Sequence, residues 1–168
     1  MTQIITNSLP MGVPGDLSRQ HAIVESWNQN VTTPVTLFGV PVKEGAVDGT
    51  ISPIAAADVT ASVIGFLVRA FPSQGGLSTN EAYGAGTPPV AGILSVMREG
   101  YMVVKVNGGV PAAQGAVYVR TVAGAGPLVV GGVEASADGA NSFVLTGATF
   151  TGGPDADGNA EIRFKVGT

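Results

Sequence analysis

The sequence contains no cysteine, a single histidine and few charged residues. Without cysteine, the chain can form no disulfide, zinc–thiolate site or iron–sulfur cluster, and it has no cysteine nucleophile. Charged residues occupy 12% of its 168 positions, roughly half of the usual share. Eight Lys and Arg against twelve Asp and Glu give a formal charge of −4, which disfavours binding to nucleic-acid phosphates. We therefore expect no nucleic-acid partner.

The sequence also lacks a long apolar run and the common catalytic motifs. Charged and hydroxyl side chains interrupt its longest apolar region, residues 54–71, whereas a membrane-spanning helix needs about 20 apolar residues. No phosphate-binding loop, nucleophile elbow or His-Glu-x-x-His motif occurs. A Ser-His-Asp triad would have to use His21, the single histidine. A position on the surface is the favoured interpretation of His21, rather than a catalytic role. We expect no membrane partner, no cofactor and no enzymatic activity; a hydrolase using Asp155 and Asp157 is the alternative.

The sequence does contain many short apolar segments separated by turns rich in glycine and proline. Glycine occurs 25 times and proline 11 times, together well above the average share. In the last segment, Ile162, Phe164 and Val166 alternate with charged residues, which is the period of a β-strand. Strands are predicted over residues 21–27, 33–43, 62–71, 90–97, 101–106, 116–122, 128–134, 141–151 and 160–166. This spacing predicts an all-β fold, an antiparallel β-sandwich or β-barrel.

Two local patterns interrupt the strands. Ser52 and Pro53 are suited to the cap and first position of a short helical turn over residues 52–58. The dipeptide Glu99-Gly100 is predicted to form a turn between two strands.

Residues 1–20 differ from the rest of the chain and are predicted to form an extended N-terminal arm, with a single β-rich domain over residues 21–168. The segment that includes Pro10, Gly12, Pro14, Gly15 and Asp16 has the composition of turns and no lasting periodicity. A frayed terminus and an arm that lies across a neighbouring subunit both fit this composition.

Residues 154–161 are the part of the sequence that most resembles a cation-binding site. Asp155, Asp157 and Asn159 surround a glycine, as in part of a calcium-binding loop. The spacing departs from the full calcium motif, because the twelfth position from Asp155 is Val166 rather than a glutamate. A tight turn at Asp157-Gly158 before the last strand is therefore favoured over a bound cation, and no metal site is assigned.

Three blocks together resemble the capsid cement, or decoration, proteins of tailed bacteriophages. The first block is Pro-Met-Gly-Val-Pro-Gly-Asp-Leu-Ser-Arg at residues 10–19. The second covers residues 96–107 and 115–120, and the third covers residues 143–150 and the final turn and strand. Each block alone is common turn-and-strand sequence, and the resemblance depends on their order and spacing over nearly the whole chain.

The resemblance implies a structural virion protein with a β-barrel or β-sandwich body and an extended arm. Such a protein binds the outer surface of the capsid and stabilises contacts between major capsid subunits, so the implied partners are the major capsid protein and further copies of this chain. A homotrimer is favoured, and a homodimer is also compatible. The alternative is another phage structural or adhesive β module, associated with a tail or fibre or binding carbohydrate.

Within this interpretation, we expect the arm to contact the capsid and the region around residues 73–89 to be a second contact. The expected arm contacts are Pro10, Gly12, Pro14, Gly15, Asp16 and Arg19, with Arg19 able to bind a carboxylate. Four residues are expected to support the fold or a subunit interface: Arg98, Tyr101, Tyr118 and Arg120.

Overall fold

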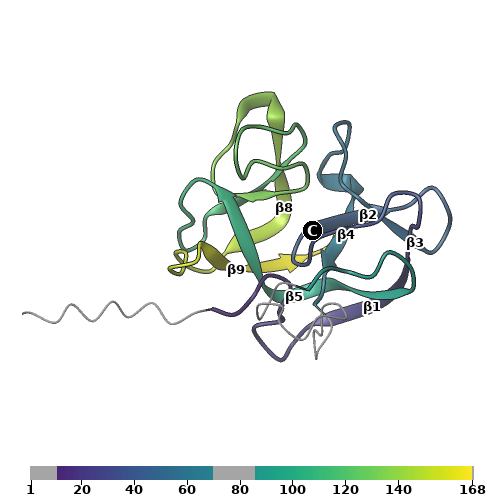
Figure 1. The fold of residues 1–168 in the computed structure, drawn as a ribbon. Coiled ribbons are helices and arrows are strands. Elements are labelled where there is room, and N and C mark those ends of the chain that lie inside the picture. Colours follow the sequence, from purple (N-terminus) through teal and green to yellow (C-terminus); the bar gives the residue numbers. More distant parts are fainter. Residues whose placement is uncertain (1–10, 70–85, 168) are drawn as a thin grey trace, which may run out of the picture.

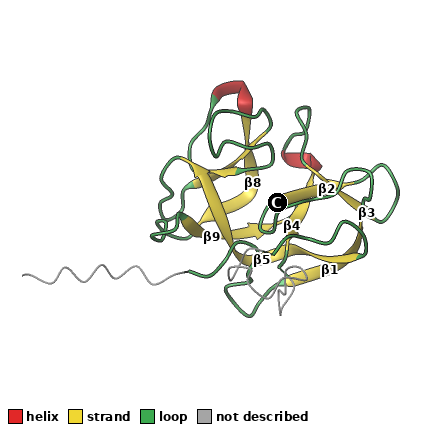
Figure 2. Ribbon diagram, viewed as in Figure 1, coloured by secondary structure: helices red, strands yellow, loops and turns green. Residues whose placement is uncertain are grey.

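The computed structural model describes residues 11–69 and 86–167. This part of the chain is all-β, with two short 3₁₀ segments, Thr60–Ser62 and Gly139–Asn141, as its helical turns (Figures 1 and 2). The strands are β1 (Ile23–Gln29), β2 (Pro41–Glu44), β3 (Thr50–Pro53), β4 (Val63–Leu67), β5 (Ile93–Gly108), β6 (Ala116–Arg120), β7 (Val133–Glu134), β8 (Ser142–Phe150) and β9 (Asn159–Lys165). No helix of the described residues has the length and apolar character needed to span a membrane.

The strands close into a barrel rather than two separate sheets. Five strands form a ring in the order β5, β7, β6, β8 and β9, and β9 pairs back onto β5. The remaining strands follow in the order β4, β2, β3 and β1, and β1 also pairs back onto β5. Most pairs are antiparallel, but β1–β3 and β5–β7 are parallel. Of the two predicted architectures, the barrel is therefore the one observed (Figure 1).

β5 is the strand that both halves of the protein share. Its first half pairs with β1 and β4, and its second half pairs with β9 and β7. The turn predicted at Glu99-Gly100 is wrong, because Glu99 pairs with Lys165 and Gly100 with Phe164 in one continuous ladder. Gly100 has a φ of +145°, and a Cβ there would lie 2.9 Å from the Cβ of Ala22. Glycine at this position thus permits close approach of the chain before β1, rather than a reversal.

Two apolar clusters fill the two halves of the protein. The larger lies inside the five-stranded barrel and includes Met102, Phe150 and Phe164. The smaller lies among β1 to β4 and includes Ile51, Leu67 and Val96. The two clusters adjoin at β4 and β5, whose successive side chains point to opposite faces. Both sides of β4 are therefore largely buried, as predicted for the strand over residues 62–71, of which β4 covers Val63–Leu67.

Of the other predicted elements, the last strand is confirmed and the helical turn is not. The alternation in the last strand is confirmed, because Ile162 and Phe164 are buried and Arg163 is exposed. The helical turn at residues 52–58 is wrong, since Ser52 and Pro53 belong to β3 and pair with β2. Pro53 is tolerated there because it is the last residue of its strand. The segments 33–43 and 128–134 are mostly loops, with strand only at their ends.

Candidate functional site

Residues 11–19, called here the N-terminal strap, lie along the second half of β5. Leu17 forms an antiparallel bridge with Met102. The Gly15 N–H donates to the carbonyl of Val103 at 2.8 Å, and the Val103 N–H donates to the carbonyl of Asp16 at 2.9 Å. An extended arm separate from the body is thus not confirmed, because these residues pair with the barrel of their own chain.

Glu161 of β9 binds the C-terminal end of the strap. Its carboxylate accepts hydrogen bonds from Ser18 Oγ and Arg19 Nη2, each at 2.6 Å. Thr151 Oγ1 donates to it as well, at 2.6 Å. Burial raises the pKa of Glu161, but the hydrogen bonds from Arg19, Ser18 and Thr151 outweigh it, so that the pKa lies below its usual value. The Arg19 guanidinium also lies over the Tyr101 ring, 4.1 Å from its centre.

Asp155 binds the other end of the strap. Its carboxylate accepts the N–H of Met11 at 3.1 Å, together with the N–H groups of Asp157 and Asn159 at 3.0 and 2.8 Å. Burial raises the pKa of Asp155, but the backbone hydrogen bonds from Asn159, Met11 and Asp157 together lower it below the usual range. Asn159 Nδ2 donates to the Gly12 carbonyl at 3.3 Å. The carboxylate thus organises a turn and anchors the strap.

The turn predicted at Asp157-Gly158 is confirmed. Gly158 has a φ of +72°, and its N–H donates to the carbonyl of Asp155 at 3.1 Å. Within residues 11–69 and 86–167, no three His, Cys, Asp or Glu side chains gather as a metal site would require.

The middle of the strap packs against the body where Gly15 and Gly39 approach each other closely. Gly15 has a φ of +94°, and a Cβ on it would lie 2.8 Å from the Cβ of Phe38. Gly39 has a φ of +71°, and a Cβ there would lie 2.6 Å from the Gly15 nitrogen. Arg69 Nε donates to the carbonyl of Pro14 at 3.0 Å. These positions need glycine because backbone packs against backbone.

Asp16 and Arg19, two of the predicted capsid contacts, have partners within the chain. The Asp16 carboxylate accepts the Val13 N–H at 3.1 Å and so closes a turn inside the strap. Arg19 pairs with Glu161, yet half of its side chain is exposed (52%). Pro10 and most of the region 73–89 lie outside the described residues.

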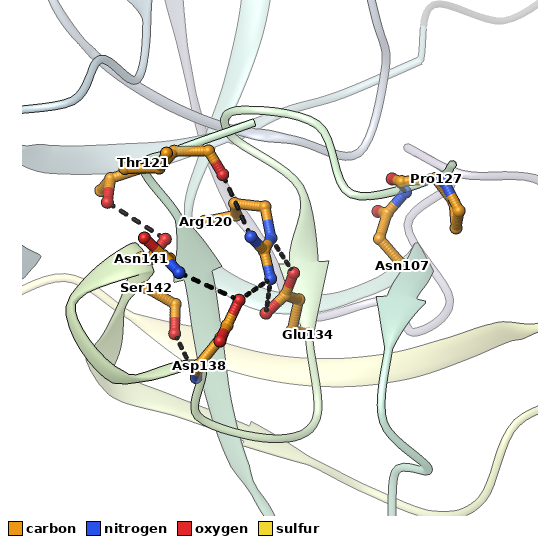
Figure 3. A network of polar contacts seen from close by, with 9 residues as sticks. Asn107, Arg120, Thr121, Pro127, Glu134, Asp138, Asn141 and Ser142 are labelled. Atoms are coloured by element: carbon orange, nitrogen blue, oxygen red, sulfur yellow. Dashed lines mark hydrogen bonds and ion pairs between the residues drawn. The ribbon is translucent and has the colours of Figure 1, made fainter. Parts of the chain in front are cut away.

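Arg120 belongs to a buried ionic network rather than to the surface (Figure 3). Its guanidinium lies between Glu134, to which Nε donates, and Asp138, which Nη2 contacts at 2.6 Å. Nη1 donates to the Val122 carbonyl at 3.1 Å. The hydrogen bond from Arg120 lowers the pKa of Asp138, and a second hydrogen bond from Asn141 lowers it further. The network joins β6, β7 and the loop before β8.

The other three residues expected to support the fold or an interface occupy separate positions. Arg98 of β5 lies with its Nε 3.7 Å from Glu25 Oε2 of β1. Tyr101 supports Arg19 as described, and Tyr118 is partly buried in β6, opposite Val144 of β8. The structure therefore gives Arg98, Tyr101 and Arg120 specific contacts inside the fold.

The sequence alone does not indicate the acidic partners of the strap and of Arg120. Glu161 alternates outward on β9 and is separated from Arg19 by 142 positions. Glu134 lies in a short segment with no distinctive pattern and is almost fully buried. No local signal could have paired them, because each pairing depends on how distant strands meet.

A pocket of about 260 Å³ lies beside the strap. Its lining includes Pro14, Leu37, Phe38, Lys105 and Val129. Among the described residues that line it, none is an acid or a histidine. Its walls are suited to apolar contact.

Comparison with known proteins agrees with a structural role. A family model described as "Structural cement protein (E217 gp24/Pam3 gp6)" matches residues 1–165. A chain in the solved structure titled "The capsid of Myoviridae Phage XM1" is similar in fold, with a TM-score of 0.67 and 15% sequence identity over 99% of this chain and 98% of that one. Among curated protein sequences, none matches.

The family match covers almost every residue, and the shared fold extends over the full length of both chains. The family is one of structural phage proteins. The chain therefore belongs to the structural cement protein family and is a virion protein of the capsid surface.

Proposed function

We propose that this protein binds the outer surface of the phage capsid and stabilises the contacts between major capsid subunits. The observation that carries the proposal is the match of the structural cement protein family to residues 1–165. A cement protein needs a rigid body and a broad contact surface rather than a catalytic pocket. Because many copies act on one lattice, a modest interface for each copy is sufficient.

The N-terminal strap, residues 11–19, is the proposed contact, together with Pro10 before it. Its side chains are presented by a backbone that is already held on β5, so that little conformational entropy is lost on docking. Met11 and Leu17, near the two ends of the strap, are exposed, each at 38%, and Arg19 follows Leu17 by two positions. The contact would combine these apolar groups with Pro14 and the exposed part of the Arg19 side chain.

A homotrimer is the proposed form of the free protein, with a homodimer as the alternative. The low charge of the surface places little electrostatic repulsion between copies. Light scattering coupled to size-exclusion chromatography measures the mass directly. A mass near three times 16.8 kDa is expected, and a monomer at working concentrations would contradict self-association in solution.

Binding to capsid shells tests the proposed function. Shells assembled from the major capsid protein alone are mixed with this protein and sedimented, and the bound amount is measured by densitometry. We expect saturable, stoichiometric binding and a higher temperature of shell disassembly. Binding to free capsid subunits with none to shells, or only a few copies for each particle, would contradict the proposal.

A matched pair of variants tests the strap. Leu17→Asp places a charge in the proposed contact, whereas Val47→Asp places one on an exposed valine in the turn between β2 and β3. We expect Leu17→Asp to weaken shell binding about tenfold or more and Val47→Asp to leave it unchanged. If Val47→Asp weakens shell binding and Leu17→Asp does not, the contact does not involve the strap.

A further inference from the structure

Among the described residues, the first half of β1 is covered by little of the protein. Its first four residues, Ile23 to Ser26, are all exposed. Successive side chains of a strand point to opposite faces, so neither face of this half of β1 packs against the core. Further along, Trp27 is partly buried and Gln29 is buried, which anchors the strand to the smaller apolar cluster.

One edge of this exposed half is also open. On its inner edge, β1 pairs with β5, where Val24 lies opposite Met97 and Ser26 opposite Ser95. On its outer edge, β1 pairs with β3 at Asn28 and Gln29 alone. Within the described residues, no strand lies along the outer edge from Ile23 to Trp27.

The direction of the backbone groups follows from the hydrogen bonds that continue the strand. The Gln29 N–H donates to Gly92 at 2.8 Å, on the β5 side, and the Asn28 N–H donates to Gly49 at 3.0 Å, on the outer side. In an antiparallel ladder, alternate residues point their N–H and C=O groups to the same side. Ser26 and Val24 therefore point these groups outward, as Asn28 does.

We propose that the outer edge of β1, at Val24 and Ser26, receives an extended peptide segment of the major capsid protein as an added β-strand. Unpaired donors and acceptors on a strand edge fit another extended chain. Val24 is 40% exposed, so the side chains of an added strand on the same face would cover apolar surface there. This proposal rests on the proposed function.

The charge at the centre of the edge favours a capsid segment over a second copy of this chain. Glu25 lies between Val24 and Ser26; its side chain is 48% exposed, and its carboxylate lies 3.7 Å from Arg98 Nε, at the long end of an ion pair. Two β1 strands that pair Val24 of each copy with Ser26 of the other would bring their Glu25 residues directly opposite each other, and like charges in that position are destabilising. A segment with Lys or Arg opposite Glu25 would instead gain a cross-strand ion pair.

Amide exchange and three variants test the proposal on the full protein with cement-free shells as the probe. Ser26→Pro removes the outward N–H and blocks an added strand, whereas Ser26→Ala keeps the N–H and serves as the matched control. Glu25→Lys reverses the charge at the centre of the edge. We expect Ser26→Pro and Glu25→Lys to weaken shell binding about tenfold or more, Ser26→Ala to bind normally, and shells to slow amide exchange in β1.

The outcomes separate this proposal from the proposed function. Normal shell binding by folded Ser26→Pro, or β1 amides that exchange equally fast with and without shells, would overturn the added strand. If Ser26→Pro fails to fold, Glu25→Lys and the exchange experiment decide the question. A Ser26→Pro variant that loses self-association but binds shells would overturn the assignment to the capsid in favour of a second copy. Absence of shell binding by the unaltered protein would overturn both proposals.

Discussion

At the scale of single residues, the few charges of this protein hold distant parts of its chain together. Arg120 is 3% exposed and pairs with Glu134 and Asp138, and Glu161 binds Ser18 and Arg19 of the strap. A buried guanidinium is costly to desolvate, so it needs partners at several of its donors. The low charge content therefore does not imply that the charges are only solubilising.

Removing Glu134 should destabilise the fold strongly. Glu134→Met leaves Arg120 buried without its main carboxylate partner, and breaking a buried pair in this way costs about 3 kcal/mol. Urea unfolding measures the loss. The double variant Arg120→Met with Glu134→Met should recover much of it, because no uncompensated buried charge is left. A double variant that is less stable than Glu134→Met alone would contradict this account of the network.

The contribution of Glu161 should depend on pH. Because the folded state lowers its pKa, the stabilisation is present above the ordinary carboxyl value and is lost as pH falls through the lower folded value. Glu161→Gln should cost up to about 1 kcal/mol at pH 7, since its Arg19 partner is half exposed. Urea unfolding should show this difference shrinking below about pH 4.

Glu99→Gln is the matched control for Glu161→Gln. Glu99 lies 3.5 Å from Lys165 in a pair that is well exposed on both sides, so its loss should be hardly measurable. Equal effects of Glu99→Gln and Glu161→Gln at pH 7 would show that the strap carboxylate has no special role.

At the scale of elements, the strap is an additional extended segment seated on β5. Its position depends on Gly15 and Gly39, whose backbones approach too closely for a Cβ. The sequence predicted the turn chemistry of this segment correctly but interpreted it as an arm, because glycine and proline describe local shape and not what the segment packs against. The last strand was predictable because alternation is itself a local pattern.

Gly39→Ala should loosen the strap. The new Cβ would meet the Gly15 nitrogen at 2.6 Å, and the clash adds to the cost of a left-handed backbone, for a total of about 2 to 3 kcal/mol. Gly49→Ala is the control, because Gly49 has a similar φ of +73° and nothing within 4 Å; it should cost about 1 kcal/mol. Thermal unfolding compares the two, and equal losses would mean that the strap is not seated as described.

At the scale of the whole molecule, β5 makes the two halves one cooperative unit. The barrel and the strands β1 to β4 each close upon it, and their two apolar clusters meet there. Separate unfolding of one half would expose buried side chains of the shared strand.

A substitution in the barrel should therefore also lower the stability of the strands β1 to β4. Leu145→Ala removes a buried side chain of the larger cluster and should cost about 2 to 5 kcal/mol. Trp27, the single tryptophan, packs against the smaller cluster. We expect Leu145→Ala to lower the melting temperature measured by Trp27 fluorescence by the same amount as the melting temperature measured by far-UV circular dichroism. A tryptophan transition that is unchanged by Leu145→Ala would show that the halves unfold independently.

The sequence by itself determined the all-β class, the alternation of the last strand, the turn at Asp157-Gly158 and the resemblance to cement proteins. The first three depend on neighbouring residues, whose backbone preferences and side-chain periodicity act locally, whereas the resemblance depends on the order and spacing of three blocks over nearly the whole chain. Tertiary structure alone decided that β5 is one strand, that residues 11–19 lie on it, and that Arg19 meets Glu161 and Arg120 meets Glu134. Those contacts join segments far apart in the chain, and they form because closing the barrel buries apolar side chains that no single segment can cover.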